Sequence, residues 1–238
     1  TVDSALIRLS GSGTHTGSFV VNTDLDLPTG STQNFSTGST VSGTGTLSNT
    51  GGITTISGPS GLVSVNMQSG QILNNTAANI DVLNVSGGII TSNPALSLNT
   101  LNLIGGTFTS NGVTTVSGLT TWNPTNSAST QTFTLNGTGS LVASGGFNLG
   151  SNLHNDILTL EVPLTIGGVG SSWVGLTAGG PTTITGLGSI TNNGTITATN
   201  PVQFQVDVPF TNSGNFVKSG GTALVEFSNT LDNSGSVT

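Results

Sequence analysis

Three stretches decide the fold: "SVNMQSGQILNN" at 64–75, "VLNVSGGIITSN" at 82–93 and "TLNLIGGTFTSN" at 100–111. Each opens with apolar residues on either side of an asparagine, and alternation at period two predicts a strand with one buried face. A glycine follows and permits a chain reversal. After it comes a second short apolar patch, and then an asparagine, a residue that tolerates left-handed turn geometry. One repeat therefore predicts strand, corner, strand, corner.

The repeat also predicts how copies of this unit stack. A single unit cannot bury its apolar positions, but stacked units form a continuous core, and each strand pairs with the strands above and below it. Asparagine recurs at one position of the first strand. We expect these side chains to form an outer-face ladder in which each amide donates to the next carbonyl: Asn66, Asn84 and Asn102.

A second register of the same pattern runs through the C-terminal part, as "ITNNGTIT" from 190, "FTNSGNFV" from 210 and "LDNSGSVT" from 231. "LSNTGGIT" from 47 matches it once. Repeats of about 20 residues are too short for propeller blades, and these lack the heptads of a coiled coil. The sequence predicts an all-β protein, a parallel β-helix (β-solenoid) with coils of about 18–21 residues.

Regularity varies along the chain. Residues 41–238 are predicted to form the solenoid, with longer loops at about 112–182, including loops around 122–131 and 151–156. Residues 1–40 are less regular and predict an N-terminal cap or a contact with a neighbouring subunit. The chain starts at Thr1 and stops inside a repeat, so we expect a processed form or a piece of a longer polypeptide or assembly.

Composition excludes several classes of function. Only 5% of the residues are charged, with 2 Lys plus Arg against 9 Asp plus Glu, for a net charge of −7. Binding to nucleic acid or to an anionic membrane needs several cations, so both are excluded. Cysteine is absent, which removes disulfides and thiol chemistry. No apolar run is long enough to predict a transmembrane helix, and no cofactor is expected.

The repeats of the form apolar-Thr-Asn-Ser-Gly-x-apolar resemble those of bacterial secreted β-solenoids, the filamentous-haemagglutinin-like adhesins and autotransporter passengers. The resemblance covers residues 41–111 and 183–238. It implies an extracellular or cell-surface location and a role in adhesion or in a structural layer. It carries over no catalytic residues, because the matching positions are glycine, asparagine and apolar residues that build coils.

Acid–base chemistry has few candidates. Asp24 and Asp26 share one strand face in "NTDLDLP", at a spacing compatible with the paired carboxyl groups of a glycosidase. The same pair would suit calcium, but no glycine-aspartate nonapeptide repeat accompanies it, and no metal site is predicted. The alternative is a solvated pair that discourages edge pairing. His154 and Asp156 lie close together, and loop polarity explains them without a nucleophile.

Two tryptophans, Trp122 and Trp173, are candidates for a glycan-stacking platform, and partial burial in the packing is the other interpretation. Threonine in "TIT" at 183–185 and 195–197, and at Thr91 and Thr109, suggests an ice-binding face. Because the threonine rows do not persist, β-propensity explains them more simply.

These observations favour a non-enzymatic extracellular structural or adhesive surface protein that forms or belongs to a fibre. An uncapped solenoid end is an unpaired strand edge, so we expect self-association end to end or with neighbouring surface proteins. The competing hypothesis is a carbohydrate-binding or polysaccharide-cleaving module. An ice-binding protein and a phage tail-spike segment are further alternatives.

Overall fold

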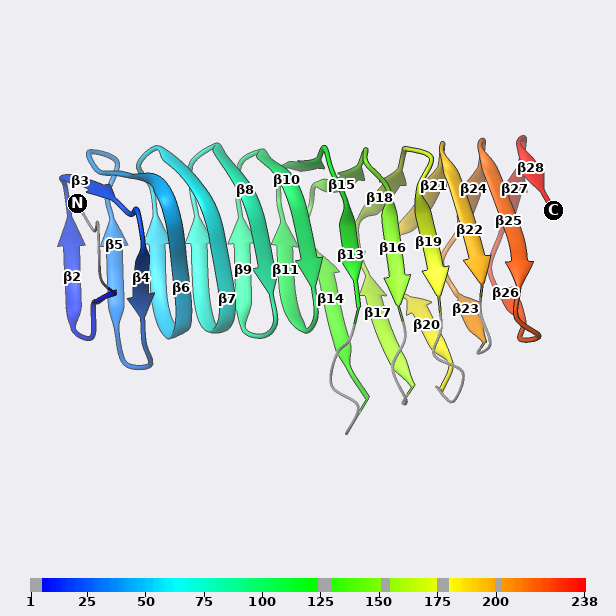
Figure 1. Ribbon diagram of the computed structural model, residues 1–238, viewed down its shortest axis with the longest axis horizontal. Helices are drawn as coiled ribbons and strands as arrows, with labels where there is room; N and C mark the ends of the chain where they lie inside the picture. Colours follow the sequence, from blue (N-terminus) through cyan, green and yellow to red (C-terminus); the bar gives the residue numbers. More distant parts are fainter. Residues whose placement is uncertain (1–5, 124–129, 151–154, 175–179, 200–202) are drawn as a thin grey trace.

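The computed structural model describes residues 6–123, 130–150, 155–174, 180–199 and 203–238. The chain winds into a rod, with the N-terminus at one end and the C-terminus at the other (Figure 1). The described residues form 28 strands in one continuous sheet, without a helix. Every pairing between them is parallel. The protein is therefore an all-β parallel solenoid, as the sequence predicted, with coils of about 21 residues.

Each coil contributes to three faces, which we name A, B and C. The long strands β6 (Thr40–Ile56) and β7 (Ser60–Asn74) bend through C, A and B in turn, and β8 (Ala78–Val85) and β10 (Leu96–Leu103) bend through C and A. The other strands of face A are β1 (Ile7–Arg8), β4 (Asp24–Leu27), β13 (Thr120–Trp122), β16 (Phe147–Gly150), β19 (Ser171–Val174), β22 (Thr195–Thr199), β25 (Asn215–Gly220) and β28 (Ser236–Val237).

Face B adds β2 (Ser12–His15), β5 (Thr32–Phe35), β9 (Ile89–Ser92), β11 (Gly106–Ser110), β14 (Thr132–Asn136), β17 (Asp156–Leu160), β20 (Thr182–Thr185), β23 (Phe204–Val206) and β26 (Val225–Phe227). Face C adds β3 (Ser18–Val20), β12 (Val113–Val116), β15 (Ser140–Ala143), β18 (Pro163–Ile166), β21 (Ser189–Asn192), β24 (Phe210–Asn212) and β27 (Leu231–Asn233).

The length of a coil follows from the register of paired strands. In the central repeats Leu83 pairs with Leu101. Further on, Gly106 pairs with Phe133, which makes that coil half as long again. Towards the C-terminus Phe204 pairs with Val225, and the coil there has an intermediate length. The wider coils fall in the segment for which the sequence predicted longer loops; residues 124–129 and 151–154 of those loops lie outside the described part of the chain.

Residues 6–40 belong to the solenoid. Strands β1, β2 and β3 pair in parallel with β4, β5 and β6. The described part of this segment therefore forms the first coils of the rod, and its role as a cap stays a prediction. A contact between this segment and another subunit remains a prediction.

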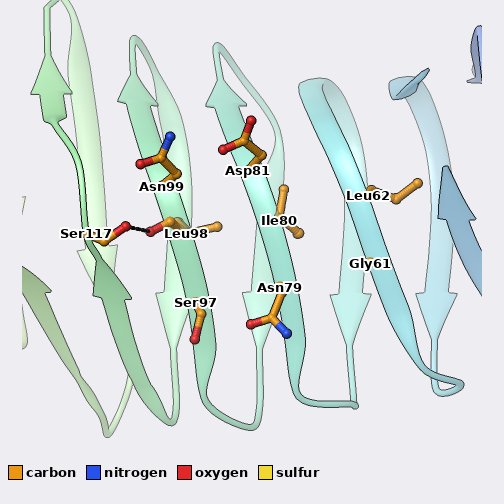
Figure 2. A pocket seen from close by; sticks show the side chains of 9 residues that line it. All are labelled: Gly61, Leu62, Asn79, Ile80, Asp81, Ser97, Leu98, Asn99 and Ser117. Carbon is orange, nitrogen blue, oxygen red and sulfur yellow. Dashed lines mark hydrogen bonds between the residues drawn. The ribbon is translucent and has the colours of Figure 1, made fainter. Parts of the chain in front are cut away.

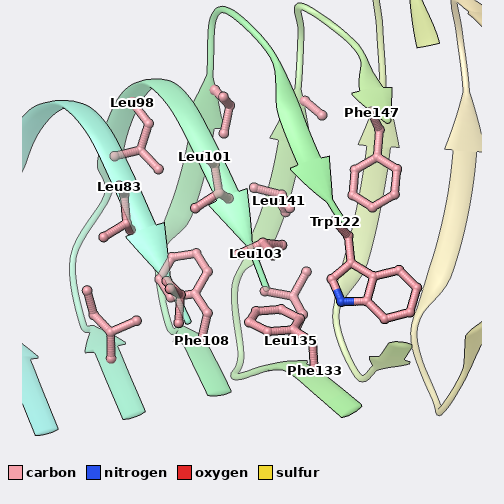
Figure 3. Packing of buried hydrophobic residues seen from close by; sticks show 14 of the residues in the cluster. Leu83, Leu98, Leu101, Leu103, Phe108, Trp122, Phe133, Leu135, Leu141 and Phe147 are labelled. Carbon is pink, nitrogen blue, oxygen red and sulfur yellow. The ribbon is translucent and has the colours of Figure 1, made fainter. Parts of the chain in front are cut away.

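The core is a set of columns along the rod axis. On face A, Leu103 pairs with Trp122 and Trp122 with Leu149, and on face B Phe108 pairs with Leu135. All of these side chains are buried, and Figure 3 shows most of them packed between the sheet faces. Apolar residues stacked on apolar residues are what allow units of about 20 residues to bury their side chains.

Glycine is required at the corners of the coils for two different reasons. Gly70, Gly88 and Gly106 have φ of +79°, +71° and +91°, in the region that favours glycine. Gly214 has another reason: a Cβ there would lie 2.0 Å from the carbonyl oxygen of Gly194 in the coil below. The chain approaches itself too closely at this corner for any side chain.

Replacing Gly214 by alanine is expected to lower the free energy of unfolding by about 1–3 kcal/mol, since the backbone must move to admit a methyl group. Chemical denaturation followed by circular dichroism measures the loss. Gly17→Ala is the matched control, because a Cβ at Gly17 meets nothing within 4 Å. Equal midpoints for the two variants would contradict the steric argument.

Candidate functional sites

Asp24 and Asp26 do not share one environment. Asp26 is 5% exposed, and its carboxylate accepts hydrogen bonds from Arg8 Nε at 2.7 Å and from Thr50 Oγ1 at 2.8 Å. Asp24 is exposed. The Asp26 carboxylate therefore joins three successive coils, from Arg8 to Thr50, and its oxygens are already bonded. This arrangement explains Asp26 as a structural residue and gives no pair of free carboxyl groups.

Both tryptophans lie in the core. Trp122 and Trp173 have no exposed surface, because each occupies an inward position of face A, and Figure 3 shows the Trp122 ring among its neighbours. The Trp173 ring lies 5.7–6.3 Å from the rings of Phe204, Phe210 and Phe216. A sugar cannot reach either indole face, so these residues do not form the predicted stacking platform. The sequence left two interpretations of these tryptophans open, and the structure supports the one in which they pack in the core.

The predicted asparagine ladder is present on the outer side of face A. Asn84 Nδ2 donates to Asn66 Oδ1 at 2.7 Å, and Asn102 Nδ2 donates to Asn84 Oδ1 at 2.7 Å. All three side chains are partly exposed. The ladder ties neighbouring coils together along the axis.

A second ladder, which the sequence did not predict, runs along an exposed corner from Asn75 to Asn93 and Asn111, with donor–acceptor distances of 2.7 and 2.8 Å. These residues were expected to adopt left-handed turn geometry. In the described residues only glycines have positive φ. The corners turn at the glycines, and the asparagines beyond them bond from coil to coil.

A third ladder is buried. Asn192 Nδ2 donates to Asn212 Oδ1 at 2.8 Å and Asn212 Nδ2 donates to Asn233 Oδ1 at 2.7 Å. The same Nδ2 atoms also reach the backbone carbonyls of Asn215 and Ser236 at 3.0 and 2.9 Å. Asn192 and Asn212 are fully buried. The recurring asparagine of the "TNNG", "TNSG" and "DNSG" motifs was the signal for it.

The histidine candidates also have structural partners or fall outside the described chain. His15 Nε2 lies 2.8 Å from Gln33 Oε1, and its ring contacts Phe19 and Phe35. His154 lies outside the described residues, while Asp156 is buried and accepts a hydrogen bond from the backbone of Gln131 at 3.0 Å. The described residues contain no cluster of three metal-ligating side chains, and they include no helix that could span a membrane.

Threonine does not form a continuous row. Thr91 pairs with Thr109, but the next residues in that column are Leu73 on one side and Asn136 on the other. The regular face that ice binding requires is interrupted after two coils. The column is consistent with threonine as an outward strand residue.

At each end of the described rod, the last strands have a pairing partner on one side only. Within the described chain, β1, β2 and β3 pair with other strands only on their inner side. The same holds at the other end for β26, β27 and β28. Apolar side chains are left uncovered there: Leu6 and Ile7 are 53% and 39% exposed, and Leu231 and Val237 are 42% and 51% exposed.

A surface hollow lies on face C, where β7, β8 and β10 bend towards face A (Figure 2). It is an open groove of about 390 Å³. Exposed polar side chains line it in two rows, Asn79 with Ser97 and Asp81 with Asn99 and Ser117, over the backbone and side chains of Leu62, Ile80 and Leu98. We call it the amide groove. Sequence reasoning missed it, although these residues alternate with Ile80 and Leu98 in "ANIDV" and "LSLNT".

The candidate sites in the described chain thus include the edge strands at either end, three asparagine ladders and one groove. The side chains first considered for acid–base work and for sugar stacking, Asp26, Trp122 and Trp173, are part of the framework. Comparison with protein-family models, with curated proteins and with solved structures found no match for this chain.

Proposed function

We propose that the protein is a non-enzymatic, extracellular or cell-surface structural or adhesive protein, and that it forms or belongs to a fibre of the kind built by the bacterial secreted solenoids that its repeats resemble. The observation that carries the proposal is the all-parallel solenoid, whose first and last described strands present edges that a further coil of the same kind can pair with. Along the sides of the rod, the strands already pair with those of neighbouring coils. New strand pairing can therefore form only at the ends, where one rod would join another.

Strand direction makes the two ends complementary. Because all strands on a face run parallel, the edge at the N-terminal end of one copy continues the ladder at the C-terminal end of another copy without reversal. An unpaired edge of this kind is a template for strand addition. A head-to-tail contact is heterologous and does not close on itself, so it propagates into a filament.

Side-chain chemistry at the ends supports the same contact. The exposed apolar residues at each end, Leu6 and Ile7 against Leu231 and Val237, would be buried by a stacked copy.

Two side chains that could take part in acid–base chemistry are held within the framework, and this supports a non-enzymatic role. The Asp26 carboxylate is bonded to Arg8 and Thr50, and the His15 ring is held between Phe19 and Phe35. A general acid or base must be free to reach a substrate proton, and these groups are committed to the framework. The low charge of the chain fits a material whose surface is built from amides and hydroxyls.

The decisive change is Leu231→Lys with Val237→Lys at the C-terminal end. We expect the parent chain to form filaments with an axial repeat of roughly 50 Å, from about ten turns at about 4.8 Å each. We expect the double variant to remain as single rods, because two buried ammonium groups at the joint are unfavourable. Negative-stain electron microscopy and light scattering of the same samples measure both.

The control is Leu187→Lys, since this side chain is 92% exposed on the side of the rod. It should polymerise like the parent. Single rods of the parent chain at all concentrations, or filaments of the double variant as long as those of the control, would overturn the proposal that the ends join.

A further inference from the structure

The amide groove differs from the other polar rows of the molecule in how its side chains are bonded. In the three ladders the asparagines donate to one another from coil to coil, even at the exposed corner of Asn75, Asn93 and Asn111. Asp81 and Asn99 lie one coil apart in the same column, but neither side chain has a hydrogen-bond partner within the described chain. Asn79 and Ser97 pair with each other in a neighbouring column. Their side chains also have no hydrogen-bond partner within the described chain. Ser117 donates to the Leu98 carbonyl at 3.3 Å (Figure 2), so the side-chain groups left for a ligand are those of Asn79, Asp81, Ser97 and Asn99.

The shape of the groove suits a linear ligand. Its two polar rows run along the rod axis, one coil after another, on either side of Ile80 and Leu98 (Figure 2). Neighbouring coils are about 4.8 Å apart, so equivalent polar groups recur at that spacing. An extended polymer lying along the axis therefore meets the same chemistry at successive units, with polar side chains at its edges and the strand backbone beneath it.

Charge selects the class of polymer. Asn79, Asn99, Ser97 and Ser117 both donate and accept hydrogen bonds, and Asp81 accepts them, which matches hydroxyl groups that do the same. The groove lining includes no cation. The two basic residues of the chain, Arg8 and Lys218, lie in β1 and β25 near opposite ends of the rod. An acidic polysaccharide would meet the Asp81 carboxylate without a counter-charge.

We propose that the amide groove binds an extended, neutral polysaccharide chain along the axis of the rod. The groove lies on the side of the solenoid, away from both open ends, so this proposal does not rest on fibre formation. In a fibre, each copy would present one such groove, and weak contacts of single rods would add up by multivalency.

The test is affinity electrophoresis of the parent chain in gels that contain soluble galactomannan, a neutral polymer with an extended backbone. Retardation of the parent is expected. Asn79→Ala with Asn99→Ala should weaken binding by at least about fivefold, since two hydrogen-bonding side chains contribute about 0.5–1.5 kcal/mol each. Asn75→Ala with Asn93→Ala is the matched control, because it removes two exposed amides from the same coils at another corner, and it should bind like the parent.

A second variant keeps the test independent of the amides. Ser97→Leu places a larger aliphatic side chain, which neither hydrogen-bonds nor stacks on a sugar ring, at an exposed position of the groove, and it should reduce retardation while far-UV circular dichroism stays unchanged. Equal retardation of the Asn79/Asn99 variant and the parent would overturn the assignment to this groove, and so would no retardation of the parent. Stronger retardation by polygalacturonate than by galactomannan would overturn the neutral class. Electron microscopy of the same samples reports separately on fibre formation.

Discussion

Replacing Trp173 by alanine is expected to lower the free energy of unfolding by about 3–5 kcal/mol, the usual range for removal of a buried aromatic side chain. The indole has no exposed surface and contacts the rings of Phe204, Phe210 and Phe216. Those rings belong to β23, β24 and β25, further along the rod than β22, the strand that pairs with β19. The cavity would therefore weaken the packing between coils, which carries much of the stability of a stacked array.

Urea denaturation monitored by far-UV circular dichroism measures the effect, with fluorescence of the remaining Trp122 as a second probe. The control is Val174→Ala, because the neighbouring side chain is 45% exposed and points away from the core. It should change the free energy of unfolding by less than about 1 kcal/mol. A loss below that value for Trp173→Ala would contradict the packing described for this coil.

The fold followed from the sequence where local pattern and long-range pairing agree. Val65, Leu83 and Leu101 occur at the same place in successive repeats, and the structure pairs them in that register. The glycines at 70, 88 and 106 mark the corners. In such repeats a neighbour in the sequence pattern is also a neighbour in space, so the pattern alone gives both strand and register.

The register of the middle coils could not be predicted. Gly106 pairs with Phe133 and Val113 with Ser140, and no motif near these residues repeats at that interval. The pairing is decided by which apolar side chains stack in the core, and that depends on the coils above and below. The same ambiguity hid the burial of Trp122, since its segment lacks a repeat that fixes which residues point inward.

The amide groove shows what a one-dimensional pattern omits. Asn79, Asp81 and Asn99 lie at the exposed positions of the alternation in 78–85 and 96–103. Concavity arises because the strands bend from face C to face A between these residues. The sequence pattern indicates which polar side chains lie on a surface. The curvature of that surface depends on the angle between two faces of the sheet.

One asparagine ladder could be predicted from the sequence, whereas the buried one could not. Asn66, Asn84 and Asn102 alternate with apolar residues, so their outward position and mutual contact could be predicted. Asn192 and Asn212 stand at inward positions after Ile190 and Phe210, where period-two alternation predicts an apolar residue. Their burial is tolerated because Asn192 Nδ2 and Asn212 Nδ2 each donate to the next asparagine and to a backbone carbonyl. A buried polar group needs such partners.

Asn212→Ala is therefore expected to cost much more than the same change in the outer ladder. It removes the donor to Asn233 and Ser236 and the acceptor of Asn192, in a site with no exposed surface. Each buried group left without a partner costs about 1–3 kcal/mol, so we expect a loss of about 3 kcal/mol. Asn84→Ala should cost about 1 kcal/mol, because water replaces the lost partner of a partly exposed amide.

Hydrogen exchange measured by mass spectrometry is the suitable readout, since the loss should concentrate in the coils that the ladder joins. Protection of β21, β24 and β27 should fall in Asn212→Ala while β8 and β10 keep theirs, and Asn84→Ala should do the reverse, more weakly. Replacement of Asn212 by aspartate tests the direction of the ladder: it removes both Nδ2 donations and keeps an acceptor for Asn192. If Asn212→Asp retained full protection, donation along the ladder would not be what stabilises these coils.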